Sequence, residues 1–320
     1  MSSIKLRRLA SSDSLSVLAI IVVIVLCILA FKPNYLSGDN VFSLLRVLAV
    51  TAVVGLSQMV VMATGGMNVA IGAVGGLCAV LLGVFIDWLK LDPLLSVALV
   101  IAAGAVCGLV NGFITLRCGG VGVASFLATL ATASVFGGIK LSITRGKPIY
   151  GLPDGFLALG NLSIAGIPFL AFVMFGVAGL CFLFFKYSKM GRQLLAFGGN
   201  GKAAELYGVS KTRVIMAAHV IGCVLAALGG MMTVARIQAA QTNIGADWML
   251  ASMAAPLLGG VRAAGGKINI LGTILGAVVL AIIANALIHF KVDIYWNDLI
   301  NGLVILAVAG INRARSARAV

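Results

Sequence analysis

The chain has 320 residues, of which 61% are hydrophobic and only 10% are charged. A soluble domain of this length needs many more polar residues to cover its surface, and we find no short alternating segments typical of a transmembrane barrel. Several apolar runs approach the roughly 20 residues that a helix needs to cross the hydrocarbon core. The composition therefore predicts an all-α polytopic membrane protein.

The formal net charge is +14, and the chain has six cysteines and two histidines. In a membrane protein, basic residues collect on the cytoplasmic loops, so we attribute the charge to orientation and not to nucleic-acid binding. The cysteines are scattered through apolar runs without a C-x-x-C pair. We therefore expect small hydrophobic side chains and no metal site.

About ten membrane spans are expected after a polar, basic tail over 1–14, and a second tail covers 312–320. The first span has no small-residue cleavage site after it, so we interpret it as uncleaved. The polar segment 140–162 contains Pro148 and Pro153, which should break any helix. The span after 247 is short enough to be re-entrant. The expected spans are 15–31, 41–64, 69–86, 94–116, 121–139, 163–185, 214–235, 248–261, 268–288 and 295–311.

The charge distribution predicts that both termini are cytoplasmic. With ten spans and the amino terminus inside, most of the 23 basic residues fall on the cytoplasmic side. Among the nine acidic residues, only Asp13 and Glu205 do so. This bias follows the positive-inside rule, and we expect residues 1–320 to form a single transmembrane domain.

The longest polar interruption is the predicted cytoplasmic loop 198–210, which holds Glu205, the only glutamate of the chain. Asn200 is a favourable N-cap and Gly208 a favourable C′ residue, so the residues between them predict a short helix. A capped helix between two spans suits contact with a partner protein. An ordinary connector that contacts anionic lipid fits the spacing equally well.

Glycine-rich breaks interrupt spans in both halves of the chain, at 64–68 and at 258–267. Broken helices at corresponding places in two halves indicate a substrate path in transporters. Glycines spaced four residues apart also predict close helix packing, within the chain or, alternatively, between two chains. These glycines are Gly72 and Gly76, Gly104, Gly108 and Gly112, and Gly272 and Gly276.

Four stretches resemble motifs of the permease subunits of bacterial ABC sugar importers, the ribose, xylose and galactoside group, in collinear order over 40–312. Asn68 and Ala70 stand where that family usually has aspartate and serine, a difference that bears on the substrate. The four stretches are 62–72, 124–130, 191–209 and 257–277. The resemblance assigns coupling to an ATPase to Gly198, Gly199, Asn200, Ala203, Ala204, Glu205 and Gly208.

The resemblance implies a permease of the bacterial inner membrane that pairs with a second copy or a close paralogue. A cytoplasmic ATP-binding subunit would drive it, and a periplasmic or lipid-anchored sugar-binding protein would deliver the solute. The chain has no G-x-x-x-x-G-K-[ST] phosphate loop, so ATP would bind to the partner. We expect no cofactor and no enzymatic activity on this chain, and membrane lipid around it.

A path for a sugar should carry neutral hydrogen-bonding groups at membrane depth. Ser125, Thr129 and Thr132 share one helical face, and Phe126 lies beside it. Each hydroxyl could instead bond to the carbonyl of the preceding turn of its own helix. Such a local explanation is weaker for the amide side chains, because an unpaired amide in lipid is costly. Further candidates for the path are Gln58, Asn68, Asn111, Asn285 and Asn301.

The function predicted from the sequence is therefore import of a monosaccharide, or of a related polyol, nucleoside or signalling sugar. Branched-chain amino acids, carried by a related permease branch, fit a neutral path less well. The alternative is a secondary carrier or facilitator that works without ATP. The predicted spans do not require any Asp, Glu, Lys, Arg or His to lie near the centre of the membrane. A proton-coupled carrier normally needs an ionisable residue there, so this alternative is less well supported. A membrane enzyme has almost no support, because no catalytic grouping occurs within the apolar runs.

Overall fold

The computed structural model describes residues 12–291 together with 296, 299, 302 and 303. Within this part of the chain, seven helices are long and apolar enough to cross a membrane. They are α3 (Gly38–Met62), α4 continued by the π-helix η2 (Ile71–Gly83 and Val84–Trp88), α5 (Pro93–Arg117), α6 (Val123–Thr144), α8 (Phe169–Tyr187), α11 (Lys211–Ile237) and α13 (Ile270–His289).

The remaining elements are not among these seven; α2 precedes them in the chain, and the others connect them. Two of them, α2 (Ser12–Phe31) and α12 (Trp248–Leu258), fall on predicted spans. The others are η1 (Pro33–Leu36), α7 (Asp154–Asn161), β1 (Ser163–Ile164), β2 (Ile167–Pro168), α9 (Lys189–Gly199) and α10 (Gly201–Leu206). The tenth predicted span, 295–311, lies almost entirely outside the described residues, so the total of ten and the placement of both termini stay predictions.

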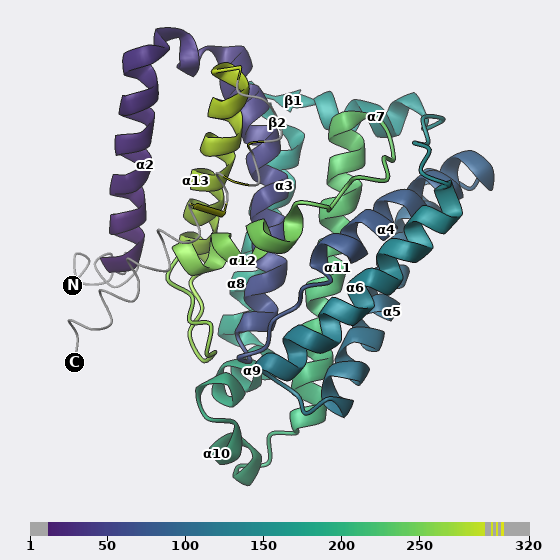
Figure 1. Ribbon diagram of the computed structural model, residues 1–320, viewed down its shortest axis with the longest axis vertical. Coiled ribbons are helices and arrows are strands. Elements are labelled where there is room, and N and C mark those ends of the chain that lie inside the picture. Colours follow the sequence, from purple (N-terminus) through teal and green to yellow (C-terminus); the bar gives the residue numbers. More distant parts are fainter. Residues whose placement is uncertain (1–11, 292–295, 297–298, 300–301, 304–320) are drawn as a thin grey trace.

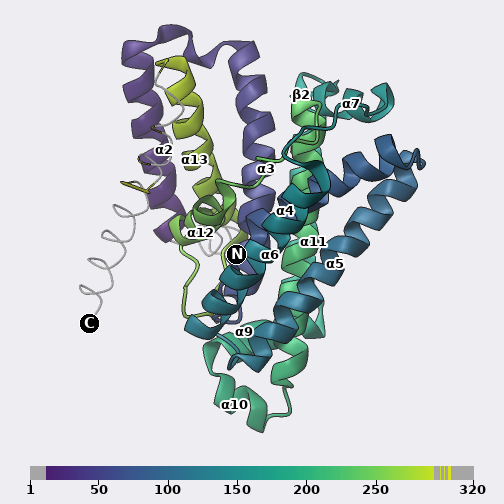
Figure 2. The ribbon, with the colours of Figure 1, turned by 45° about the vertical axis from the view of Figure 1, so that its right-hand side comes forward.

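Helix α11 is the centre of the bundle. It contacts α3, α4, α5 and α7 along its length, and it runs between the two ends of the molecule in Figure 1. Helices α9 and α10 lie at the end where α11 begins. Helix α7 and the β1–β2 hairpin lie at the end where α11 finishes, and the second view agrees (Figure 2). The ends of α11 therefore mark the two faces of the protein.

Two expectations for the middle of the chain were wrong. Helix α6 continues to Thr144, and α7 begins directly after Pro153. Proline is tolerated at the start of a helix, so this proline precedes a helix instead of preventing one. The predicted span 163–185 also begins too early, because 163–168 forms the antiparallel β1–β2 hairpin. Ala165 and Gly166 supply the two positive φ angles, +51° and +80°, of its tight turn.

The glycine spacings serve packing within the chain, as predicted. On α5, a methyl group at Gly104 would lie 2.7 Å from the Ala227 side chain of α11, and one at Gly108 would lie 2.5 Å from the Val220 backbone. On α13, a methyl group at Gly276 would overlap the Ala255 carbonyl of α12. The helix backbones approach closely because these positions carry no side chain.

Candidate functional site

The chain between α3 and α4 leaves the helical conformation over residues 63–70, as the sequence predicted. Side chains of α6 pair with the backbone of this helix break. The Ser125 hydroxyl donates to the Met67 carbonyl at 2.6 Å and lies 3.3 Å from the Met67 N–H. Thr129 Oγ1 accepts from the Val69 N–H at 3.0 Å. These bonds compensate backbone groups that a broken helix leaves unpaired.

A cluster of buried amides lies beside the break. In the orientation that satisfies both of its polar atoms, the Gln58 amide donates to the Asn68 carbonyl at 3.1 Å and accepts from its N–H at 3.3 Å. The Asn68 side chain accepts from the Ala70 N–H at 3.0 Å and donates to Cys223 Sγ at 3.5 Å. Asn111 Nδ2 lies 3.5 Å from Asn68 Oδ1. The cluster is neutral and mostly satisfied within the protein.

The structure therefore brings five predicted path residues together, namely Gln58, Asn68, Asn111, Ser125 and Thr129. All five are fully buried, so their observed partners are the helix break and one another. Thr132 is buried nearby and donates to the carbonyl of Thr129 at 3.1 Å. Phe126 is 37% exposed. Contact of these residues with a solute stays a prediction.

Asn285 belongs to a different site, and Asn301 lies outside the described residues. The Asn285 amide donates to Asn40 Oδ1 at 2.9 Å and accepts from Asn40 Nδ2 at 3.2 Å. This pair connects α13 to α3 beside Tyr35, whose hydroxyl donates to the Ile282 carbonyl at 3.3 Å. Burial raises the pKa of Tyr35 from its ordinary value of 10.0 to about 12. Asn285 thus has a structural partner away from the break.

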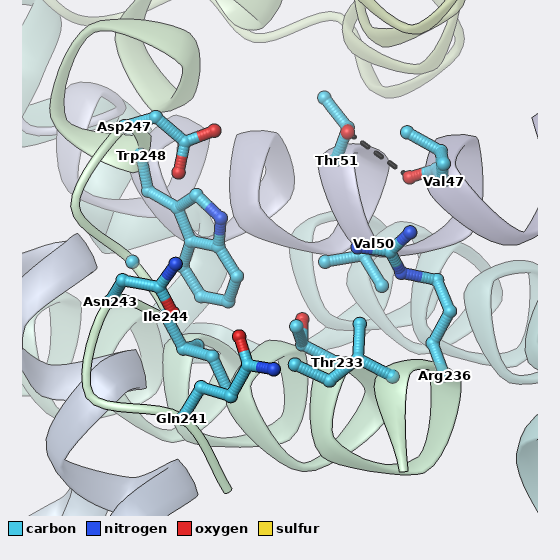
Figure 3. Close-up of a pocket in the computed structure, with 12 residues that line it drawn as sticks. Val47, Val50, Thr51, Thr233, Arg236, Gln241, Asn243, Ile244, Asp247 and Trp248 are labelled. Carbon is cyan, nitrogen blue, oxygen red and sulfur yellow. Dashed lines mark hydrogen bonds between the residues drawn. The ribbon is translucent and has the colours of Figure 1, made fainter. Parts of the chain in front are cut away.

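A cavity of about 240 Å³ lies where α11 ends. It is lined by α3, the last turn of α11, the loop over 238–247 and the first residue of α12, and it is open to the outside (Figure 3). Trp248 forms part of its wall, and the indole packs against Gly75 and Gly229. The polar lining residues are Thr51, Thr233, Arg236, Gln241, Asn243 and Asp247. The cavity thus offers both charges, amides and hydroxyls.

Glycines of α4 and one lysine hold the loop that lines this cavity. A methyl group at Gly72 would overlap the Gly245 carbonyl, and one at Gly76 would overlap the Ile244 carbonyl. Lys140 of α6 is only 7% exposed and donates to the same Ile244 carbonyl at 3.2 Å. The backbone of the loop over 238–247 therefore packs against Gly72 and Gly76, where the sequence suggested that another helix would pack.

The sequence analysis missed the cavity, although one signal pointed to it. Gln241, Asn243 and Asp247 are polar residues in the connector between two apolar segments, after Arg236. The buried positions of Lys140 and His219 were also unforeseen, and His219 packs under the glycines of α5. Among the described residues, no group of three or more His, Cys, Asp or Glu is placed to hold a metal ion.

The predicted short helix after Asn200 is confirmed as α10. Asn200 caps it by accepting the Ala203 N–H at 3.0 Å, and Gly208 follows with a φ of +80°. Gly198 and Gly199 end α9, Ala204 is buried, and Glu205 is exposed. The sequence analysis did not single out the next two side chains, Leu206 and Tyr207, which are 89% and 90% exposed. The tip of α10 thus presents an apolar pair to the surroundings.

Known proteins resemble the chain over nearly its whole length. Ribose import permease protein RbsC of Bacillus subtilis is 33% identical, covering 92% of this chain and 91% of that protein. Autoinducer 2 import system permease protein LsrC of Klebsiella pneumoniae is 30% identical, covering 95% and 87%. Galactose/methyl galactoside import permease protein MglC of Escherichia coli is 27% identical, covering 93% and 94%. No solved structure matches the chain.

These relatives confirm the resemblance to import permeases that the sequence motifs indicated, and they agree with a multi-pass protein of the inner membrane. A family model described as branched-chain amino acid transport system / permease component matches residues 40–309. The chain therefore belongs to this permease family.

Proposed function

We propose that this chain is the transmembrane subunit of an ATP-driven importer of a monosaccharide or a related polyhydroxylated solute. The observation that carries the proposal is α10, a capped helix outside the bundle with Leu206 and Tyr207 almost fully exposed. Large apolar side chains that cluster on a solvent-exposed surface mark interaction sites. The permeases named above support the class of solute, because they import ribose, autoinducer 2 and galactosides.

The proposed assembly has three partners besides membrane lipid. A second permease, identical or paralogous, completes the pore. A cytoplasmic ATP-binding subunit docks on α10, and a sugar-binding protein delivers solute at the opposite face. With 27 residues, α11 spans about 40 Å at 1.5 Å per residue, enough to place α10 and the cavity on opposite sides of the membrane. Import then proceeds by alternating access, with α10 receiving the movement of the ATPase.

Reconstitution into proteoliposomes tests this proposal against an ATP-independent carrier. We expect uptake of one member of a panel of radiolabelled pentoses, hexoses and polyols only when the ATPase, the binding protein and ATP are present. The Tyr207→Ala variant should still insert and should bind the ATPase more weakly, because it removes half of the exposed apolar pair. Uptake by the subunit alone, driven by a solute gradient, would refute the proposal.

We further propose that the cavity at the end of α11 is the first binding site for the solute. Its 240 Å³ falls just below the usual range of roughly 300–1,000 Å³ for ligand pockets, a size that suits one sugar ring. The amides of Gln241 and Asn243 both donate and accept hydrogen bonds, as sugar hydroxyls require. Trp248 and the loop over 238–247 give these amides a fixed wall.

Two neighbouring residues of the loop provide a matched test of this proposed binding site. Asn243 lines the cavity, whereas the hydroxyl of the adjacent Thr242 donates to the Gly146 carbonyl at 3.4 Å outside it. We expect Asn243→Ala to raise the KM for uptake by roughly five- to tenfold, the worth of a hydrogen bond of about 1 kcal/mol. Thr242→Ala should leave the KM unchanged. Equal effects of both variants would show that only loop structure matters.

A further inference from the structure

Three segments that are far apart in the sequence meet through glycine backbone at the end of the bundle where α9 and α10 lie. They are the helix break, the end of α9 and the loop between α12 and α13. The Gly266 N–H donates to the Ala63 carbonyl at 3.0 Å. A methyl group at Gly198 would overlap that carbonyl oxygen and lie 2.6 Å from the Gly266 nitrogen. Gly198 is thus packed directly against a hydrogen bond between the other two segments.

The neighbouring glycines complete this contact, which we name the glycine junction: Gly65, Gly198, Gly199, Gly265 and Gly266. A methyl group at Gly265 would lie 2.5 Å from the Gly65 nitrogen and 2.9 Å from the Gly198 Cα. At Gly266 it would lie 2.7 Å from the Gly199 Cα. Gly265 and Gly266 also have φ angles of +90° and +77°, which disfavour any side chain. The three backbones are therefore in mutual contact.

Each segment of the junction leads to a different part of the proposed transport machinery. The end of α9 continues through the Asn200 cap into α10. The helix break carries the amide cluster and is bonded to the start of α6, where the Gly122 N–H donates to the Gly65 carbonyl at 3.1 Å. The third segment follows α12, whose first residue, Trp248, lines the cavity. Figure 1 shows this loop descending from α12 toward α9.

We infer that the glycine junction transmits movement of α10 to the helix break and to α12. This inference rests on the proposed role of α10 as the contact with the ATPase. Long side chains between two elements can absorb a small shift by changing rotamer, but backbone atoms in contact have no such freedom. A shift of the end of α9 must therefore displace Ala63 and Gly266 together. Switching proteins amplify small shifts through such closely packed contacts.

A glycine of α9 and a glycine of α8 supply a test with a matched control. Gly198→Ala places a methyl group into the junction, whereas a methyl group at Gly176, within α8 and outside the junction, meets nothing within 4 Å. Both positions are helical, so both variants gain the same helix propensity. Each variant is reconstituted with the ATPase and the binding protein, using radiolabelled ribose first and methyl galactoside second. The number of ATP molecules hydrolysed per solute imported is the measurement, because a purely structural defect lowers both rates together.

We expect Gly198→Ala to raise this ratio about tenfold, within the range of mutations that alter coupling between sites, and Gly176→Ala to leave it unchanged. An unchanged ratio in both variants, or an equal rise in both, overturns the inference. If the unmodified importer takes up neither these two solutes nor any other member of the panel of pentoses, hexoses and polyols with ATP, the proposed function fails instead. The two failures are thereby distinguished.

A second measurement decides the matter if Gly198→Ala does not assemble with the ATPase. Hydrogen exchange is followed in the unmodified assembly, with and without a non-hydrolysable ATP analogue. Peptides covering 62–70, 196–207 and 260–268 should change protection together, because their backbones are in contact. A change confined to 196–207 overturns the inference.

Discussion

At the scale of single residues, hydroxyl groups on α6 hold the helix break in place. The bonds between Ser125 and the Met67 backbone are 2.6 Å and 3.3 Å long, and the serine is fully buried. The sequence showed that Ser125, Thr129 and Thr132 share a face. It could not show whether this face meets a solute or the protein backbone, because both partners offer the same hydrogen-bonding groups.

Replacement of Ser125 by alanine should lower the free energy of unfolding by about 1–3 kcal/mol. The partly buried Met67 N–H loses its partner, and the Met67 carbonyl keeps only the Thr129 hydroxyl at 3.4 Å. Ser134→Ala is the matched control. It lies on the same helix and is exposed, and its hydroxyl bonds only to the Leu130 carbonyl of its own helix, at 3.5 Å. Denaturant unfolding in detergent measures both changes. Equal stability of the two variants would contradict this assignment.

At the scale of elements, the sequence predicts helices better than the contacts of loops, because helix signals are local and loop contacts involve distant residues. Apolar runs and caps located the long helices and α10, since these signals are local. The seating of the 238–247 loop on α4 was not predictable, because the Gly72–Gly76 spacing indicates a close approach without naming the approaching segment. The polar lining of the cavity likewise comes from residues distant in the chain, such as Thr51 and Asn243.

Gly72→Ala tests the seating of this loop. Its methyl group would overlap the Gly245 carbonyl and lie 3.2 Å from the Trp248 Cβ. We expect a loss of about 1–3 kcal/mol in stability from overpacking. Gly137→Ala on α6 meets nothing within 4 Å, and it should stabilise by up to about 1 kcal/mol through helix propensity. Thermal unfolding compares the pair, and a Gly72→Ala variant as stable as Gly137→Ala would disprove the seating.

At the scale of the whole molecule, α10 and the cavity lie at opposite ends of α11, and the basic residues near α10 predict that this end is cytoplasmic. Single cysteines at Tyr207 and Asn243, in a chain without its six native cysteines, test this orientation. A membrane-impermeant maleimide should label Asn243→Cys in intact cells and Tyr207→Cys only after permeabilisation. Labelling of both from the same side would exclude the proposed arrangement.

The apolar tip of α10 also affects how the subunit behaves in isolation. Leu206 and Tyr207 are 89% and 90% exposed, and the capped helix that carries them keeps them away from the core. Copies of the subunit purified without other proteins can therefore associate with one another through these side chains. Sulfate strengthens the burial of apolar surface, so added ammonium sulfate should promote clumping of the lone subunit, and a soluble protein bound at the tip should prevent it.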